Sequence, residues 1–459
     1  MRIFKGLPLF LVFALLGLFS CNNQDPEPPV DLGSNAAVNQ WIYEIMEQVY
    51  YWLEDMGNPI AETSDPEDFF EALLNRPTDR FSVIYPDYQE LINSLNGITL
   101  EAGYEFILYT DSQNSNLVVA EITYIKKNSP AESAGLLRGD VIQAINGEAM
   151  TIDNYREVLE DISATHIISY LRFNEGTNQY EDQGNLELNV VQLAENPNFL
   201  DTIYTINNQK IGYVIYHFFA PGPGSGSTVY DDEMDGIFAK FKAEGIDHLI
   251  VDFRYNGGGF VSSAVNLASL IAPSVDQNDI FSKTKYNSFL SQFDDFQNVQ
   301  TPFKTKPENL GNILDGNRVY ILTSRRTASA SELIINGLKP YMDVFLIGDV
   351  TTGKNVGSIP FEDDNNPQNA YGILPIVTQS FNSLDESDYT TGFTPNISAR
   401  EVNERLRPLG DINEQLLRTA ITEITGEAPS GRFKKLDRQD IGSTLDNKIR
   451  SGRMIETMN

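Results

Sequence analysis

The chain has 459 residues, of which 41% are hydrophobic and 11% aromatic, so it can bury packed cores and is not intrinsically disordered. Its formal net charge of −31 argues against nucleic-acid binding, because phosphate recognition needs clustered Lys and Arg side chains. At roughly 150 residues per domain, the length predicts about three domains.

The N-terminus has the pattern of an export signal. Two basic residues, Arg2 and Lys5, precede an apolar run over residues 7–19 that is too short to span a bilayer comfortably. The run is followed by Ser20 and by Cys21, the only cysteine of the chain, so the folded part has neither disulfides nor a thiolate metal site. We predict a signal peptide over residues 1–20 and a Pro-, Asn- and Asp-rich tether over residues 21–35.

A small residue before a Cys directly after an apolar run resembles the lipobox of bacterial lipoproteins. The resemblance implies acylation of Cys21 and a membrane anchor made of lipid. It also implies a cell-envelope location, either facing the periplasm or on the surface of the outer membrane. The alternative is an ordinary secretory signal with an incidental cysteine.

Residues 36–96 have helical patterns. Apolar residues recur at close to a helical period from Trp41 to Leu53. A second helix is expected after Asp65-Pro66-Glu67, where Ser64 or Asp65 can cap the helix and Pro66 suits its first turn. We predict a small helical bundle.

Residues 97–193 are rich in predicted strands, at residues 104–109, 117–124, 141–145, 167–173 and 186–191. Between the second and third strands, Ser129 and Pro130 can open a one-turn helix that Gly135 ends. The succession of turns and strands resembles the PDZ domain, which implies peptide binding by strand addition near the loop of Gly103, Tyr104 and Phe106. The family more often has Gly where this loop has Glu105, whose carboxylate would repel a free C-terminus. Recruitment of substrate and regulation are both open as roles.

Residues 200–426 alternate strands and helices, which predicts an α/β sheet covered by helices. Strands are expected at residues 210–217, 248–252, 319–322, 344–347 and 373–379, and helices from about Tyr230, Ser262 and Ser329. Residues 427–459 are locally basic, and we interpret them as a solvated or partly ordered tail in preference to a binding arm.

Three motifs of the α/β region can carry chemistry. Gly257-Gly258-Gly259 follows a strand and offers main-chain N–H groups of the kind that stabilise an oxyanion. Ser329 lies between a strand and a helix, where a serine is usually a cap but can also present a nucleophilic hydroxyl. Lys354 lies in a Gly-flanked loop and is a possible base for that hydroxyl.

Together these motifs resemble the C-terminal processing peptidases, the tail-specific proteases of serine peptidase family S41. The resemblance covers nearly the whole chain after the tether, and it includes Asp79-Arg80-Phe81-Ser82 and Gly392-Phe393-Thr394-Pro395-Asn396. It implies a nucleophile at Ser329 and a base 25 residues further on, at Lys354. The implied fold is multidomain α+β: an N-terminal helical bundle, a PDZ-like β domain and an α/β (ClpP/crotonase-like) S41 protease core.

The same resemblance assigns the remaining site residues. Glu332 matches the family and can orient the site, although a first-turn Glu also suits the helix dipole. Ser358 stands where the family often has a Gln that is hydrogen-bonded to the lysine. Gly258 and Ala330 are expected to supply the oxyanion N–H groups. Lysine is a base only when neutral, and burial can lower its pKa of about 10.4 by ~3–5 units.

We therefore expect a serine endopeptidase that uses no cofactor and cuts exported polypeptides, with cleavage near their C-termini and cleavage elsewhere both open. The three histidines are too few and too scattered for a metal site or a His-dependent triad. The alternatives are a catalytically weak S41-like binding protein and a PDZ scaffold of the cell envelope. No oligomeric state is predicted.

Overall fold

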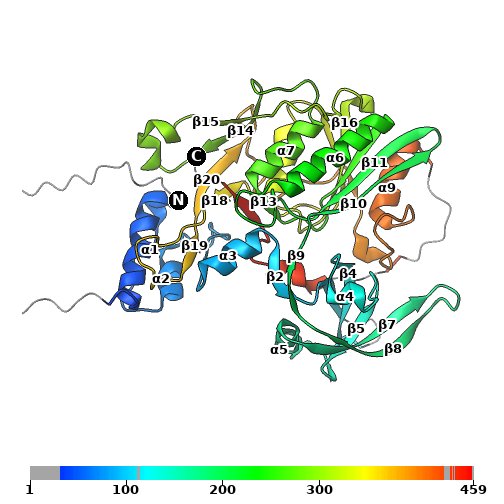
Figure 1. Cartoon of the computed structure of the whole chain (residues 1–459), viewed down its shortest axis with the longest axis horizontal. Helices are drawn as coiled ribbons and strands as arrows, with labels where there is room; N and C mark the ends of the chain where they lie inside the picture. The colour runs from blue at the N-terminus through cyan, green and yellow to red at the C-terminus, as the bar shows by residue number, and fades with distance from the viewer. Residues whose placement is uncertain (1–30, 111–113, 428–434, 437, 439, 457–459) are drawn as a thin grey trace, which may run out of the picture.

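The structure is a computed structural model that describes residues 31–456 except 111–113, 428–434, 437 and 439 (Figure 1). The predicted signal peptide and the predicted lipidation site, Cys21, lie outside the described residues. Within the described part of the chain, no helix has the length and apolarity needed to cross a membrane.

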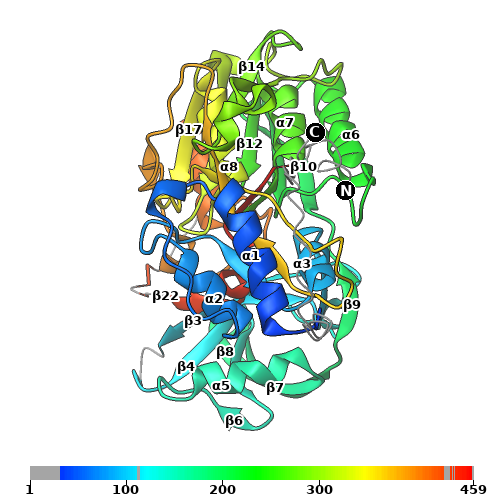
Figure 2. The ribbon, with the colours of Figure 1, turned by 90° about the vertical axis from the view of Figure 1, so that its left-hand side faces the viewer.

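The N-terminal helices are α1 (Asn35–Val49), α2 (Pro66–Leu73) and α3 (Tyr88–Leu95). The carboxylate of Asp65 caps α2 by accepting from the N–H of Glu67 at 2.9 Å, and Pro66 occupies the first turn, as the sequence predicts. The helices do not form a core by themselves. Ile42 of α1 and Phe70 of α2 share a buried cluster with Ile373 and Val377, and Figure 2 shows both helices on one side of the molecule.

The PDZ-like part is a seven-stranded antiparallel sheet with the order β22-β3-β4-β5-β7-β8, in which β6 pairs with β5 off this path and the C-terminal strand β22 lies at the edge beside β3. The strands and helices are β3 (Tyr104–Thr110), β4 (Val118–Ile125), α4 (Pro130–Ser133), β5 (Val141–Ile145), β6 (Glu148–Ala149), α5 (Tyr155–Glu160), β7 (His166–Asn174), β8 (Gln179–Leu188) and β22 (Asp440–Ser443). As predicted, Ser129 caps α4, and its Oγ accepts from the N–H of Glu132 at 3.1 Å. The predicted strand at residues 186–191 is divided, because β8 ends at Leu188 and β9 (Val191–Ala194) pairs with β2 (Ile98–Glu101).

The α/β part is built on a six-stranded sheet whose four central strands run parallel. The strands are β10 (Asn198–Ile206), β11 (Gln209–Tyr216), β12 (His248–Asp252), β16 (Arg318–Thr323), β17 (Asp343–Gly348) and β21 (Ile397–Ser398). Helices α6 (Val229–Glu244), α7 (Val261–Ile271) and α8 (Ala330–Leu338) cover one face, and α9 (Gln415–Thr425) covers the other. Successive side chains of β12 show the two faces: Val251 packs with α6 to α8, and Ile250 packs with α9.

A second six-stranded sheet has the order β13-β23-β18-β20-β14-β15. Its strands are β13 (Gly258–Phe260), β14 (Ile280–Lys285), β15 (Val299–Pro302), β18 (Val356–Ser358), β20 (Ile376–Phe381) and β23 (Arg453–Ile455). The predicted strand at residues 373–379 is two strands, because Pro375 has no N–H to donate to a ladder. Before it, β19 (Gly372–Leu374) pairs with β1 (Val83–Tyr85), and after it β20 joins the second sheet.

The end of the chain corrects one prediction. Residues 440–456 are not a solvated tail, since β22 and β23 each join a sheet and the side chains of Arg450 and Arg453 are buried. The guanidinium of Arg450 lies 2.5 Å from the carboxylate of Glu195, a partner 255 residues away in sequence. A locally basic composition cannot reveal such a partner.

Candidate active site

Ser329 lies in the turn between β16 and α8, as the sequence predicts. Its backbone has φ +64° and ψ −115°, a conformation that costs a non-glycine residue on the order of 1–3 kcal/mol. Two bonds hold the turn: Thr327 Oγ1 donates to the carbonyl of Phe253 at 2.8 Å, and the N–H of Ala328 donates to that of Asn256 at 3.1 Å. Ser329 occupies the N-cap position of α8, and its buried Oγ has no hydrogen-bond partner among the described residues.

The glycine loop touches this turn. Gly258 has φ +108°, and a Cβ added there would lie 2.7 Å from Cβ of Ser329, so only glycine allows so close an approach. Gly258 does not offer a free oxyanion donor as expected, because its N–H donates to Oδ1 of Asn256 at 2.9 Å. The N–H of Ala330 is the first of helix α8, where the helix itself supplies no acceptor.

Glu332 connects the serine turn to the lysine loop. One carboxylate oxygen accepts the N–H groups of Ser329 and Lys354, each at 2.8 Å. The other accepts from the hydroxyl of Thr351 at 2.6 Å and from the N–H of Gly353 at 2.7 Å. Burial raises the pKa of Glu332, although all four donors favour the charged form. Glu332 therefore orients both loops through their main chains and does not contact the Ser329 hydroxyl.

Lys354 is fully buried beside the second sheet. Its Nζ donates to the carbonyl oxygen of Gly452 at 2.7 Å and lies 4.8 Å from the centre of the Phe81 ring. Burial drives the pKa of Lys354 well below its usual range and the nearby Arg453 guanidinium lowers it further, whereas Asp79 raises it. The Ser329 hydroxyl does not donate to the Lys354 amine in this arrangement: its Oγ has no hydrogen-bond partner among the described residues, and the amine donates to Gly452.

The other predicted residues lie as follows. Ser358 is buried in β18, its Oγ has no partner among the described residues, and its carbonyl accepts from the N–H of Glu456 at 3.0 Å. In the PDZ-like loop, the carbonyl of Gly103 accepts from the N–H of Lys126 at 2.9 Å, and the buried hydroxyl of Tyr104 bonds to His166 at 2.8 Å. The N–H and the carbonyl of Phe106 are hydrogen-bonded to the side-chain hydroxyls of Thr444 and Ser443 in the C-terminal segment.

Several residues that shape the site were not assigned roles from the sequence. Asn256 holds the Gly258 N–H, and its own Nδ2 donates to the carbonyl of Tyr216 at 2.8 Å. An Asn two residues before a glycine is a turn signal that could have indicated this contact. Phe81 and Gly452 border the lysine from opposite ends of the chain. Phe81 lies in the Asp79-Arg80-Phe81-Ser82 motif, but that motif alone did not indicate a contact with Lys354, and no local pattern marks Gly452. No group of His, Cys, Asp and Glu side chains within the described ranges is arranged to hold a metal ion.

Comparisons with known proteins match three stretches of the chain. The family model described as peptidase family S41 matches residues 210–399, that of the peptidase S41 N-terminal domain matches residues 37–83, and that of a PDZ domain matches residues 121–169. The first stretch contains the serine turn, the glycine loop and the lysine loop. The second contains most of α1 and all of α2, and the third contains the centre of the PDZ-like sheet.

Relatives agree with this assignment. A chloroplastic C-terminal processing peptidase of Tetradesmus obliquus is 25% identical over 312 residues, which are 64% of this chain and 60% of that protein. A carboxyl-terminal-processing protease of Picosynechococcus is also 25% identical, over 63% of each chain. The chain thus spans about 60% of the length of these curated relatives.

A solved structure resembles the whole fold. The crystal structure of a proposed S41 protease from Bacteroides fragilis is 28% identical, with a TM-score of 0.70 over 88% of this chain and 99% of that one. The three family matches agree with the similar relatives and with the shared fold. The chain belongs to peptidase family S41.

Proposed function

We propose that this chain is a serine endopeptidase in which Ser329 is the nucleophile and Lys354 the base. The observation that carries the proposal is the state of the Lys354 amine, which is buried, has a lowered pKa and donates to the carbonyl of Gly452, the residue before β23. A neutral amine can accept a proton from a serine hydroxyl at neutral pH, as a surface lysine cannot.

The proposed reaction is acyl transfer. Oγ of Ser329 attacks a peptide carbonyl carbon while Nζ of Lys354 takes the hydroxyl proton. The oxyanion is held by the N–H of Ala330 and, once Asn256 releases it, by the N–H of Gly258. The C–N bond then breaks and the Lys354 ammonium protonates the leaving amine. Water hydrolyses the acyl-enzyme, with Lys354 again taking the proton, and Ser329 is regenerated.

The first step requires Lys354 to leave the carbonyl of Gly452 and face Ser329. Lysine has a flexible four-carbon side chain, and rotation about its bonds is the proposed movement. We propose that Ser358 does not contact the reacting atoms directly. We also propose that the loop of Gly103, Tyr104 and Phe106 is part of a peptide-binding edge.

Exported polypeptides are the proposed substrates, and acylation of Cys21 is the proposed anchor in the cell envelope. Mapping of cut sites tests the function. Unstructured peptides with free and with amidated C-termini are incubated with the protein, and the products are identified by mass spectrometry. We expect internal cuts in both sets, with faster cutting of the free-ended set if a terminal carboxylate is recognised. If the peptides stay intact after prolonged incubation with the wild type and with the variant Met454→Asp, the result would instead support a binding protein.

Replacement of Glu332 by Gln tests the orienting carboxylate. The amide keeps one acceptor oxygen, but its NH₂ group faces two donors, so two of four hydrogen bonds to a charged group are lost. At ~1.5–3 kcal/mol each, the free energy of unfolding should fall by about 3 kcal/mol or more. We expect kcat to fall by about 10- to 100-fold with little change in KM, because the carboxylate orients the reacting groups and not the bound peptide.

Glu423→Gln is the matched control, since this exposed residue of α9 should change stability by less than about 0.5 kcal/mol. Urea unfolding and steady-state kinetics measure both effects. A Glu332→Gln protein with wild-type kcat would contradict the orienting role.

A further inference from the structure

The C-terminal segment, residues 440–456, binds first at the edge of the PDZ-like sheet. Strand β22 pairs antiparallel with β3, with Gly442 opposite Leu108 and Ser443 opposite Ile107. The hydroxyl of Ser443 donates to the carbonyl of Phe106 at 2.7 Å, and the N–H of Phe106 donates to Thr444 Oγ1 at 3.0 Å. The chain thus supplies its own added strand at the open edge of this sheet.

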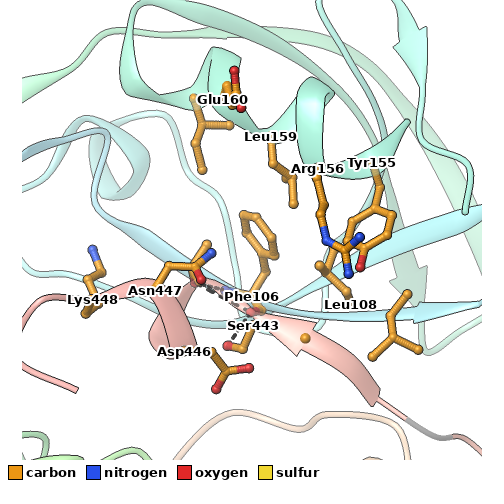
Figure 3. Close-up of a pocket in the computed structure, with 14 residues that line it drawn as sticks. Phe106, Leu108, Tyr155, Arg156, Leu159, Glu160, Ser443, Asp446, Asn447 and Lys448 are labelled. Carbon is orange, nitrogen blue, oxygen red and sulfur yellow. Dashed lines mark hydrogen bonds between the residues drawn. The ribbon is translucent and has the colours of Figure 1, made fainter. Parts of the chain in front are cut away.

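This edge is the wall of a cavity of about 620 Å³ (Figure 3). Phe106 and Leu108 of β3 face Tyr155 and Leu159 of helix α5 across it, and the C-terminal segment borders it from Ile441 to Lys448. A groove between a sheet edge and a helix is suited to an extended peptide bound by strand addition. Here the C-terminal segment already takes the hydrogen bonds of that edge.

The middle of the segment completes a buried charge network. The Nζ of Lys126 lies 2.5, 2.9 and 3.0 Å from carboxylate oxygens of Glu101, Glu105 and Glu195, so without the C-terminal segment one cation would face three carboxylates. Lys448 adds an ammonium 2.6 Å from Glu101 and 3.0 Å from Glu105, while Arg450 lies 2.5 Å from Glu195.

Burial alone would raise the pKa of Glu195, but the Arg450 and Lys126 cations hold it well below its usual range. Three carboxylates and three cations balance only when the segment is in place. Removing partners from a buried network is costly, so these contacts fix the segment strongly.

The end of the segment enters the proposed active site. Strand β23 lies between β13 and β18 and runs parallel to both. The N–H of Arg453 donates to the carbonyl of Gly257 at 3.2 Å, and the side chains of Met454 and Ile455 are buried. A Cβ on Gly258 would lie 2.3 Å from the carbonyl oxygen of Arg453, so the glycine loop leaves room for a peptide backbone here.

The bound segment is placed to block and not to react. The carbonyl oxygen of Gly452 accepts from the Lys354 amine, and the N–H of Gly258 remains bonded to Asn256. A carbonyl about to be attacked would need its oxygen on main-chain donors and the amine free to take the serine proton. Neither condition holds, and Oγ of Ser329 has no hydrogen-bond partner in the described part of the chain.

We propose that residues 440–456 are an intramolecular competitor of polypeptide substrates, occupying the strand-addition edge of the PDZ-like sheet and the cleft beside Ser329 at the same time. The inference rests on the proposed peptidase function. A substrate that displaces β22 from the PDZ-like edge loosens the network of Lys448 and Arg450 and, through it, β23. Binding at the PDZ-like part thereby opens the cleft, and the substrate enters along the path that β23 leaves.

A charge placed in β23 tests the proposal. In Met454→Asp a carboxylate replaces a buried apolar side chain at the end of the chain, and Leu384→Asp makes the same type of change at a side chain that is 64% exposed. With Ser329→Ala added so that nothing is cut, hydrogen exchange measures whether the segment is bound. We expect amides of residues 440–456 to exchange at least about 10-fold faster with Met454→Asp than with Leu384→Asp.

Hydrolysis of an unstructured protein is then compared without Ser329→Ala. Met454→Asp should be about 10-fold more active than the wild type and Leu384→Asp equal to it. A synthetic peptide of residues 440–456 should reduce the extra hydrolytic activity of Met454→Asp. It is added at ~1 mM, the order of the effective concentration of a tethered segment. If Met454→Asp lowers the folded fraction by circular dichroism, Ile455→Asp is used, since Ile455 packs in a separate cluster with Leu91 and Leu374.

The outcomes separate the two proposals. If residues 440–456 exchange faster in Met454→Asp while its hydrolysis is measurable and equal to that of the wild type, the competitor role would be overturned and the proposed peptidase function would stand. Faster exchange with no hydrolysis in any variant would overturn the peptidase, and with it the competition for substrate. Removal of the last residues from the wild type, but not from Ser329→Ala, would show the segment to be a substrate and would also contradict the inference.

Discussion

Ser329→Ala is expected to lower kcat/KM for hydrolysis of an unstructured protein by about 10⁴-fold or more, since loss of a serine nucleophile costs up to ~10⁶ in kcat. The same variant should be as stable as the wild type. The Oγ of Ser329 in the wild type makes no hydrogen bond within the described part of the chain, so the substitution removes none. Progress curves and urea unfolding measure the two effects.

Ser129→Ala is the informative control for stability. Ser129 is a capping residue whose Oγ accepts from the N–H of Glu132 at 3.1 Å, and its replacement should cost about 1 kcal/mol. If Ser329→Ala lost as much stability as Ser129→Ala while retaining hydrolysis, Ser329 would be a helix cap and not a nucleophile.

Lys354→Arg and Lys354→Met are both expected to reduce hydrolysis to within about 10-fold of Ser329→Ala, because a guanidinium stays charged and a thioether is not a base. In the wild type, kcat/KM should rise with pH through the lowered pKa of Lys354, as the amine becomes neutral. Turnover by Lys354→Arg at a substantial fraction of the wild-type rate would exclude the proposed base.

Lys354 also has a predictable effect on stability. In the unfolded chain the amine is protonated below its ordinary pKa of about 10.4, whereas in the folded protein burial favours the neutral form. The unfolded state therefore binds more protons between the folded pKa and about 10.4, and stability rises with pH over that window. Lys354→Met should remove this dependence and raise Tm at neutral pH.

Lys240→Met is the control for the loss of a lysine. Lys240 is exposed and pairs with Asp201 at 2.6 Å on the surface, so its loss should change stability by less than about 1 kcal/mol. Thermal unfolding at several pH values separates the two variants. A Lys354→Met protein with lower Tm than the wild type at neutral pH would contradict burial of a neutral amine.

Local signals of the sequence predicted several elements of the fold, among them the turn that carries Ser329. The cap at Asp65, the one-turn helix from Ser129 and the turn at Ser329 all depend on residues within a few positions of one another. The strand at residues 248–252 was predicted with its observed bounds, because a continuous apolar run marks a buried parallel strand.

Features that depend on distant partners could not be predicted. Burial of Lys354 needs Phe81 from the start of the folded chain and Gly452 from its end. The basic residues near the C-terminus were interpreted as solvated because their carboxylate partners, such as Glu195, lie hundreds of residues earlier in the sequence. The position of β23 in the cleft follows from these pairings and from the burial of Met454 and Ile455, and no periodicity within the last residues indicates it.

Covalent labelling tests the central claim most directly. The wild type and the released variant Met454→Asp are treated with a serine-directed fluorophosphonate, digested, and the modified peptide is identified by mass spectrometry. The account predicts a single adduct on Ser329 that forms faster in Met454→Asp and is absent when Lys354→Arg is added. An adduct on a different hydroxyl, or an equal rate of labelling with Lys354→Arg, would contradict it.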